Sequence, residues 1–99
     1  MDYFGELQAK IYLLHGCGAR HRQTVPVKEI FEGKTVWDGE VEVFDLIGHA
    51  TAKRCYAWGY ANEKQPDKLD VVTVLEISPV VSPETAVKAA IASRVRSAR

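Results

Sequence analysis

Three residues that could ligate a metal or act as nucleophiles lie together in the stretch His-Gly-Cys-Gly-Ala-Arg-His. His15, Cys17 and His21 carry imidazole nitrogen and thiol sulfur, which zinc prefers, and the glycines would let the chain wrap around an ion. A fourth ligand is missing nearby, and the two arginines beside His21 would repel a cation. Cys17 with a histidine as base would also need an oxyanion site, which no motif marks. We therefore expect a basic loop, with no metal or other cofactor and no catalytic residue.

A row of acidic residues in segment 36–47 is a second feature that could do chemistry. Asp38, Glu40 and Glu42 alternate with apolar residues, and Asp45 follows them. Paired carboxylates catalyse acid–base reactions when burial separates their pKa values. In a strand, however, this alternation places the acids on the face opposite to the apolar residues. We expect these carboxylates to point into water or to pair with basic side chains.

Tyr56, Trp58 and Tyr60 form the most suggestive local pattern, because residues spaced by two lie on the same face of a strand. Their rings could pack in the core, or they could form the centre of a homodimer interface. They could also stack on a flat ligand or on nucleic-acid bases. Lys53 and Arg54 precede them in the chain. The sequence leaves these roles open.

The loop 48–52 lies next to these basic residues and contributes His49 and Thr51. Together with Lys53 and Arg54, these side chains could hold an anion or another small ligand. A phosphate-binding glycine motif does not accompany them. We therefore treat His49, Lys53 and Arg54 as ligand or interface candidates beside the three aromatic residues.

A C-terminal helix over residues 83–98 is the clearest element that could position these side chains. Ser82 provides a side-chain cap, Pro83 suits the first helical position, and Glu84 favours the positive end of the helix dipole. We expect one apolar face of this helix to pack on a sheet. That face carries Val87, Ala90, Ile91 and Val95, and the basic residues near the end are Arg94, Arg96 and Arg99.

Three segments predict the strands of that sheet. Residues 36–47 predict a long bent strand with a bulge at 44–46, and residues 53–61 predict a strand with one large and one small face. The small face favours the close approach of a helix. Residues 70–78 are apolar on both sides, which favours a central strand.

The first third of the chain has a less regular pattern. Apolar residues from Phe4 to Leu14 recur at helical spacing and Gly16 could end such a helix, although residues 11–14 alone fit a strand equally well. Residues 25–31 fit either a short helix or an edge strand. Whether the first 25 residues are ordered stays open at this point.

Length and composition favour a single α+β domain over residues 1–99. We expect a three- or four-stranded, mostly antiparallel sheet packed by the C-terminal helix, with N-terminal segments at the edge or on the other face. The 13 basic and 13 acidic side chains leave no net charge, which argues against a dedicated nucleic-acid binder. We find neither a membrane span nor a secretion signal in the sequence, so we expect a cytoplasmic protein with Cys17 and Cys55 reduced.

Several segments also resemble a known group of proteins: residues 35–46, the Gly48-His49 loop, residues 52–58 and residues 82–91. Over residues 33–92 the chain resembles small bacterial proteins of unassigned activity, some of which are encoded on mobile integron gene cassettes. In those proteins the loop more often has Gly-His-Pro where this chain has Gly-His-Ala. The resemblance implies a bacterial cytoplasmic protein and supplies no catalytic residues.

These observations favour a non-enzymatic binding or adaptor protein that self-associates. We expect a homodimer, because a small open sheet with spare aromatic residues usually needs a second cover. A second hypothesis is a small-ligand-binding protein or minor enzyme with a pocket between sheet and helix near His49, Lys53 and Arg54. A third is weak nucleic-acid binding through the basic ends of the chain. The sequence does not identify the partner protein or small molecule.

Overall fold

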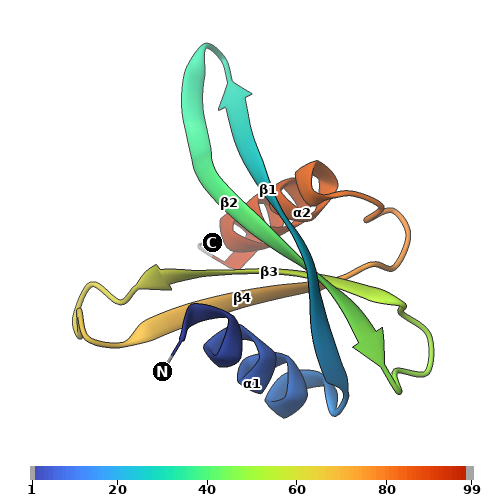
Figure 1. Ribbon diagram of the computed structural model, residues 1–99. Helices are drawn as coiled ribbons and strands as arrows, with labels where there is room; N and C mark the ends of the chain where they lie inside the picture. The colour runs from blue at the N-terminus through green and yellow to red at the C-terminus, as the bar shows by residue number, and fades with distance from the viewer. Residues whose placement is uncertain (1, 98–99) are drawn as a thin grey trace.

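Two helices enclose a four-stranded antiparallel sheet in which every strand pairs with its neighbour in the chain. The computed structural model describes residues 2–97, with side chains described as far as Arg94. The sheet has the order β1-β2-β3-β4 (Figure 1), which confirms the predicted α+β class. The elements in chain order are α1 (Tyr3–His15), β1 (Gly18–Phe31), β2 (Lys34–Ile47), β3 (Arg54–Ala61), β4 (Leu69–Leu75) and α2 (Pro83–Ser97).

α1 and α2 cover opposite faces of the sheet (Figure 1), and the side chains of β3 alternate between them. Tyr56 and Trp58 lie in the hydrophobic cluster under α2, whereas Cys55 and Ala57 lie in the cluster under α1. The small side chains let α1 approach closely, so that Leu7 is completely buried. The prediction of a large and a small face on this strand, with a helix against the small one, is confirmed.

Local signals explain the bounds of α1. Asp2 caps its beginning by accepting the N–H of Gly5 at 2.6 Å. Gly16 ends it with a φ of 67°, a left-handed conformation that glycine adopts without strain. Leu7 and Ile11 bury the inward face. The predicted N-terminal helix is confirmed, and the strand alternative for residues 11–14 is excluded.

Residues 25–31 belong to the edge strand β1, so the helix alternative for this segment is also excluded. Pro26 lies in the middle of β1, opposite Glu40 of β2. Because proline lacks an N–H, it suits a position on an edge strand where that group would face away from the partner strand.

Two details of the sheet differ from the sequence prediction. The pattern of residues 70–78 predicts a central strand, but β4 ends at Leu75 and is an edge strand. It is apolar on both sides because α1 and α2 both contact it. The bulge predicted at 44–46 lies instead in the facing strand, where the register shifts between His21 and Gln23 of β1.

α2 begins at the expected cap. Ser82 Oγ accepts the N–H of Thr85 at 3.2 Å, and Thr85 Oγ1 accepts the N–H of Ser82 at 2.9 Å. Ala86 and Val87 are fully buried against the sheet. Within the described residues, neither helix is long and apolar enough to cross a membrane. The predicted helix end at residue 98, Arg99, and the side chains of Val95 and Arg96 lie outside the part that the structure describes.

β1 and β2 form a long hairpin that projects beyond the rest of the sheet (Figure 1). Its turn is made by Glu32 and Gly33, whose φ values are 51° and 77°. Ile30, Phe31 and Val36 lie beside this turn and are exposed. We call these three residues the hairpin tip.

Candidate functional site

β2 and β3 pair over only part of their length and then diverge (Figure 1). Their ladder joins residues 42–45 of β2 to residues 54–57 of β3. Beyond the ladder, β2 pairs only with β1, and β3 pairs only with β4. The space between them is a half-open cleft of about 1000 Å³, which we call the fork cleft. Its walls include Tyr3 from α1, Trp37 and Glu40 from β2, Trp58 and Tyr60 from β3, and Arg94 from α2.

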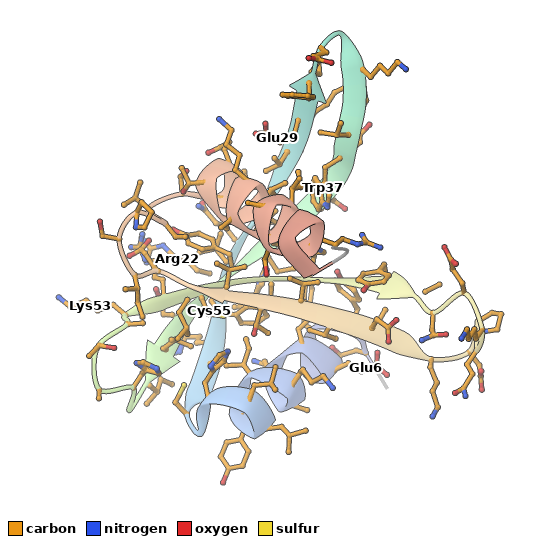
Figure 2. The ribbon with its side chains drawn as sticks, turned by 180° about the vertical axis from the view of Figure 1, so that it is seen from behind. Glu6, Arg22, Glu29, Trp37, Lys53 and Cys55 are labelled. Atoms are coloured by element: carbon orange, nitrogen blue, oxygen red, sulfur yellow. The ribbon has the colours of Figure 1, made fainter. Side chains whose placement is uncertain are left out.

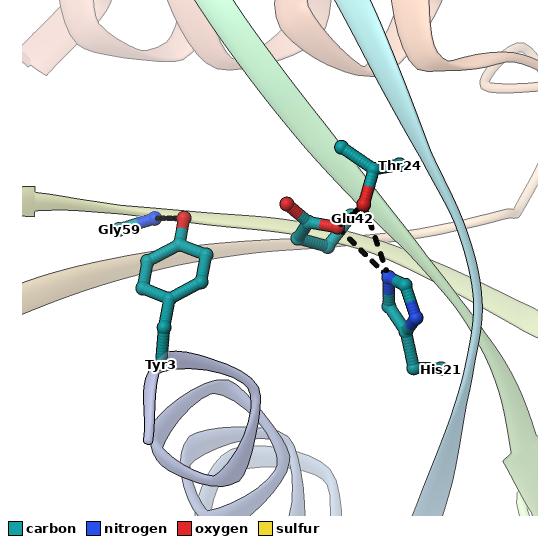
Figure 3. Close-up of polar contacts among 5 residues, drawn as sticks. All are labelled: Tyr3, His21, Thr24, Glu42 and Gly59. Atoms are coloured by element: carbon teal, nitrogen blue, oxygen red, sulfur yellow. Dashed lines mark hydrogen bonds and ion pairs between the residues drawn. The ribbon is translucent and has the colours of Figure 1, made fainter. Parts of the chain in front are cut away.

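Backbone groups of β3 point across the fork cleft. In the ladder, Leu46 N–H donates to the carbonyl of Lys53. Alternation along β3 therefore directs the main-chain groups of its odd-numbered residues toward β2. Gly59 N–H points this way, and the Tyr3 hydroxyl accepts it at 2.8 Å (Figure 3). A side chain of α1 thus takes the place of the missing β2 partner.

Tyr3 acts here as a neutral hydrogen-bonding group. Burial raises the pKa of its hydroxyl, and the carboxylates of Glu42 and Glu40 act in the same direction. The hydrogen bond from Gly59 lowers this pKa, but by less than burial raises it. The phenol therefore keeps its proton at neutral pH while it accepts the backbone N–H.

Trp37 and Trp58 form an aromatic wall of the fork cleft. Their ring centroids are 5.3 Å apart with an interplanar angle of 70°, an edge-to-face geometry. Gly39 permits this arrangement, because a Cβ there would lie 3.1 Å from the Trp37 ring. Trp58 is buried, and Trp37 is half-buried beside α2 (Figure 2). The wall is therefore anchored in the core and partly open to a ligand.

A polar cluster lies at the point where β2 leaves β3 (Figure 3). Glu42 is only 3% exposed, accepts a hydrogen bond from Thr24 Oγ1, and has its Oε1 2.8 Å from His21 Nε2. Phe4 of α1 stacks on the His21 ring at 4.3 Å. Of the two environments expected for Glu42, water or a basic partner, the structure excludes water, because α1 covers this side of β2, and places the His21 imidazole of β1 beside the carboxylate. We call His21, Thr24 and Glu42 the branch cluster.

The branch cluster does not have the geometry of a catalytic triad. In a nucleophile–histidine–acid triad, the hydroxyl and the carboxylate contact opposite nitrogens of the imidazole. Here Thr24 Oγ1 lies 3.4 Å from His21 Nε2, and Glu42 contacts that same nitrogen. Thr24 also donates directly to Glu42. The arrangement therefore stabilises a buried carboxylate.

The structure does not bring the three candidate metal ligands together. His15 Nε2 lies 2.9 Å from Thr73 Oγ1, Cys17 is buried in the cluster under α1, and His21 belongs to the branch cluster. Burial lowers the pKa of His15, and nearby His49 acts in the same direction. Within residues 2–97, no group of three or more His, Cys, Asp or Glu side chains could hold a metal ion. The expected basic loop is instead the end of α1 and the start of β1.

The candidates around the β2–β3 loop lie at the other end of the sheet from the fork cleft, as the position of Lys53 in Figure 2 shows. His49 Nδ1 accepts two backbone N–H groups of its own loop, at 3.1 and 2.9 Å. Arg54 pairs with Asp45 at 3.4 Å, and Lys53 is exposed. These side chains are thus separated from the aromatic rings of the cleft.

The three aromatic residues of β3 are divided between the core and the cleft. Tyr56 is buried under α2, and its hydroxyl donates a hydrogen bond to the Glu76 carboxylate. Burial is the main cause that raises the pKa of Tyr56, and Glu76 raises it further. Trp58 packs in the same cluster and also lines the cleft. Tyr60 lines the cleft and is 45% exposed. Core packing therefore accounts for most of the surface of Tyr56 and Trp58, and Tyr60 is the most accessible of the three rings.

No protein-family model, curated protein or solved structure matches this chain. The sequence patterns do not single out Tyr3, Thr24 or Gly59. Gly59 is a glycine inside a strand, which often marks the close approach of another group. Here the Leu69 side chain fills the space that a Cβ would need, at 2.9 Å.

Proposed function

We propose that this chain is a non-enzymatic binding module that accepts an extended polypeptide segment in the fork cleft. The observation that carries the proposal is the short β2–β3 ladder, which leaves the remainder of β2 without β3 as a partner. Open strand edges bind extended peptides as an additional strand, with main-chain hydrogen bonds supplying affinity and side-chain pockets supplying specificity. The resemblance to bacterial cassette proteins supports a bacterial, cytoplasmic role.

The edge of β2 is the one available to an incoming strand. Because Glu42 directs its main-chain groups toward β3 in the ladder, alternation directs those of Glu40 and Asp38 into the cleft. On the facing edge, Gly59 N–H is already bound to Tyr3. We therefore expect the segment to pair with β2 rather than with β3.

The size and lining of the cleft also favour binding. Its volume of about 1000 Å³ lies at the upper end of the usual range for ligand sites. Trp37, Trp58 and Tyr60 offer apolar contact area on rigid rings, which lose little conformational entropy when a ligand binds.

Peptide selection from a random displayed library, with the folded chain as bait, tests the proposal. Two variants at Glu40 separate strand pairing from loss of the side chain: Glu40→Ala keeps the N–H that points into the cleft, and Glu40→Pro removes it. The proline costs no hydrogen bond to β1, because that N–H faces away from β1. Circular dichroism confirms that both variants fold.

We expect Glu40→Pro to bind the selected peptides about tenfold or more weakly than Glu40→Ala does, as measured by titration calorimetry. Hydrogen exchange should also slow at Asp38 and Glu40 when a peptide binds, because their amides point into the cleft and become paired. A selection that yields no binder, or equal affinities for the two variants, overturns the proposal.

The hairpin tip favours a second function, self-association into a homodimer. Ile30 and Phe31 are 60% and 65% exposed at the end of a projecting element (Figure 1). Clustered exposed apolar side chains are typical of interaction surfaces. Two lysines and two glutamates flank the tip: Lys28, Glu29, Glu32 and Lys34. Because these charges balance, two tips related by a twofold axis would meet without net repulsion.

Sedimentation equilibrium tests this second function. We expect a dimer for the wild type and a monomer for Phe31→Asp, because the charge cannot be buried in an apolar contact. Leu13→Asp makes the same kind of change at a residue that is 75% exposed on α1, and it should leave the dimer intact. A monomeric wild type, or a dimeric Phe31→Asp variant, overturns self-association through the tip.

A further inference from the structure

We propose that the segment bound in the fork cleft carries basic residues at every second position and apolar residues between them. This inference rests on the proposed function and specifies the chemical class of its ligand. Side chains of β2 alternate between the α1 side and the α2 side of the sheet. The two sides present different chemistry to a strand that lies beside β2.

The α1 side of β2 is acidic where it borders the cleft. Glu42 and Phe44 lie on this side, so alternation places Glu40 and Asp38 there as well. Asp38 and Glu40 are exposed and line the cleft, whereas Glu42 is engaged by the branch cluster. Opposite charges on neighbouring strands attract each other. A lysine or arginine facing Glu40 and another two residues away, facing Asp38, would satisfy both carboxylates.

Among the residues whose side chains the structure describes, α2 contributes Ser93 and the cation Arg94 to an otherwise mainly apolar side of the cleft. Trp37, Trp58 and Ala90 lie on this side and would contact a valine, leucine or isoleucine of the bound strand. Arg94 of α2 also lines the cleft and is exposed. It would repel a basic side chain that pointed toward α2. The charges therefore determine which face of the segment is basic.

Three synthetic peptides of equal length, acetylated and amidated so that their ends are uncharged, test the inference. The first alternates lysine and valine, the second contains the same residues in two blocks, and the third alternates glutamate and valine. The fluorescence of Trp37 and Trp58 reports binding. We expect the first peptide to bind about tenfold or more tightly than the other two. Added salt should weaken the binding of the first peptide, because salt screens exposed charge pairs.

A charge reversal inside the cleft provides the matched test. Glu40→Lys should transfer the preference from the basic alternating peptide to the acidic one. Glu32→Lys makes the same charge change at the hairpin turn, outside the cleft lining, and should leave the preference unchanged. Circular dichroism verifies the fold of both variants before titration.

The outcomes distinguish the two proposals. Equal binding of the three peptides, or no change of preference in Glu40→Lys, overturns the inference about charge. A library-selected peptide that is sensitive to Glu40→Pro would still support the cleft as a peptide site in that case. If neither the library nor the synthetic peptides yield a binder, the cleft function itself is overturned.

Discussion

The two ends of the region between β2 and β3 are held together by different interactions. At the ladder end the strands pair through their backbones, and Phe44 and Cys55 are completely buried. At the open end side-chain contacts replace the ladder: the Tyr3 hydroxyl of α1 accepts the Gly59 N–H of β3, and Trp37 of β2 packs against Trp58 of β3. A buried backbone ladder opens only with the whole fold, whereas the open end has no such ladder and leaves this edge of β2 without a strand partner. The ladder end thus serves stability and the open end is available for binding.

A bulge in the neighbouring strand explains where β2 leaves β3. The register of β1 on β2 shifts between His21 and Gln23, opposite Phe44 and Val43. A bulge bends a strand pair and increases its twist. Glu42, the next residue of β2, is the last one in the ladder with β3. The bend therefore turns the hairpin away from β3 at the branch cluster.

The largest expected effect comes from damaging the ladder end. Phe44→Ala should lower the free energy of unfolding by about 4 kcal/mol, because deleting a fully buried ring leaves a cavity. Trp37→Ala, at the open end, should cost less than half as much, because its ring is only half-buried. Urea denaturation measures both changes. Equal losses would show that the open end is packed as tightly as the ladder end.

The junction between the two ends should show an intermediate effect. Glu42→Ala should lower the free energy of unfolding by about 2 kcal/mol, because His21 and Thr24 lose their shared acceptor. Glu42→Gln retains an acceptor oxygen and should cost less. Hydrogen exchange at Ala57, the partner of Glu42 in the ladder, should become faster in Glu42→Ala. Unchanged exchange at Ala57 would mean that the branch cluster does not hold the end of the ladder.

Burial at the ladder end also predicts a loss of stability at alkaline pH. Desolvation raises the pKa of the Cys55 thiol from 9.0 to about 12, with a smaller contribution in the same direction from Cys17. Between pH 9.0 and about 12, the Cys55 thiol is deprotonated in the unfolded chain but keeps its proton in the folded chain. This thiol therefore leaves the free energy of unfolding unchanged below pH 9 and lowers it as the pH rises above 9. The decline is about 1.4 kcal/mol per pH unit. Urea midpoints measured from pH 8 to 10.5 should fall less steeply in Cys55→Ala, and equal slopes would contradict this cause.

Signals from nearby residues were sufficient to predict most elements of the fold. Ser82 and Pro83 marked the start of α2, the spacing of Leu7 and Ile11 indicated α1, and period-two alternation identified the two faces of β3. Strand order depends instead on pairing between distant residues. The apolar pattern of β4 fits a central strand, but it fits equally well an edge strand with a helix on each face.

The candidate site was harder still to predict, because it depends even more on contacts between residues that are distant in the sequence. Alternation correctly placed Glu42 opposite to its apolar neighbours, yet its burial depends on Phe4 and His21, which come from other elements. Trp58 and Tyr60 were candidates from sequence and do line the cleft. The divergence that creates the cleft has no local signal in β2, because the bulge that bends β2 lies in β1.

The smallest expected effect tests the open end directly. Tyr3→Phe removes only the hydroxyl that binds Gly59 N–H, so the free energy of unfolding should fall by about 1 kcal/mol. The Gly59 amide should exchange faster with solvent, while the Ala57 amide inside the ladder keeps its protection. Tyr12→Phe makes the same change at an exposed tyrosine of α1 and serves as the control. If Gly59 exchange is the same in both variants, the Tyr3 hydroxyl does not hold the open end, and the contrast with the ladder end fails at this contact.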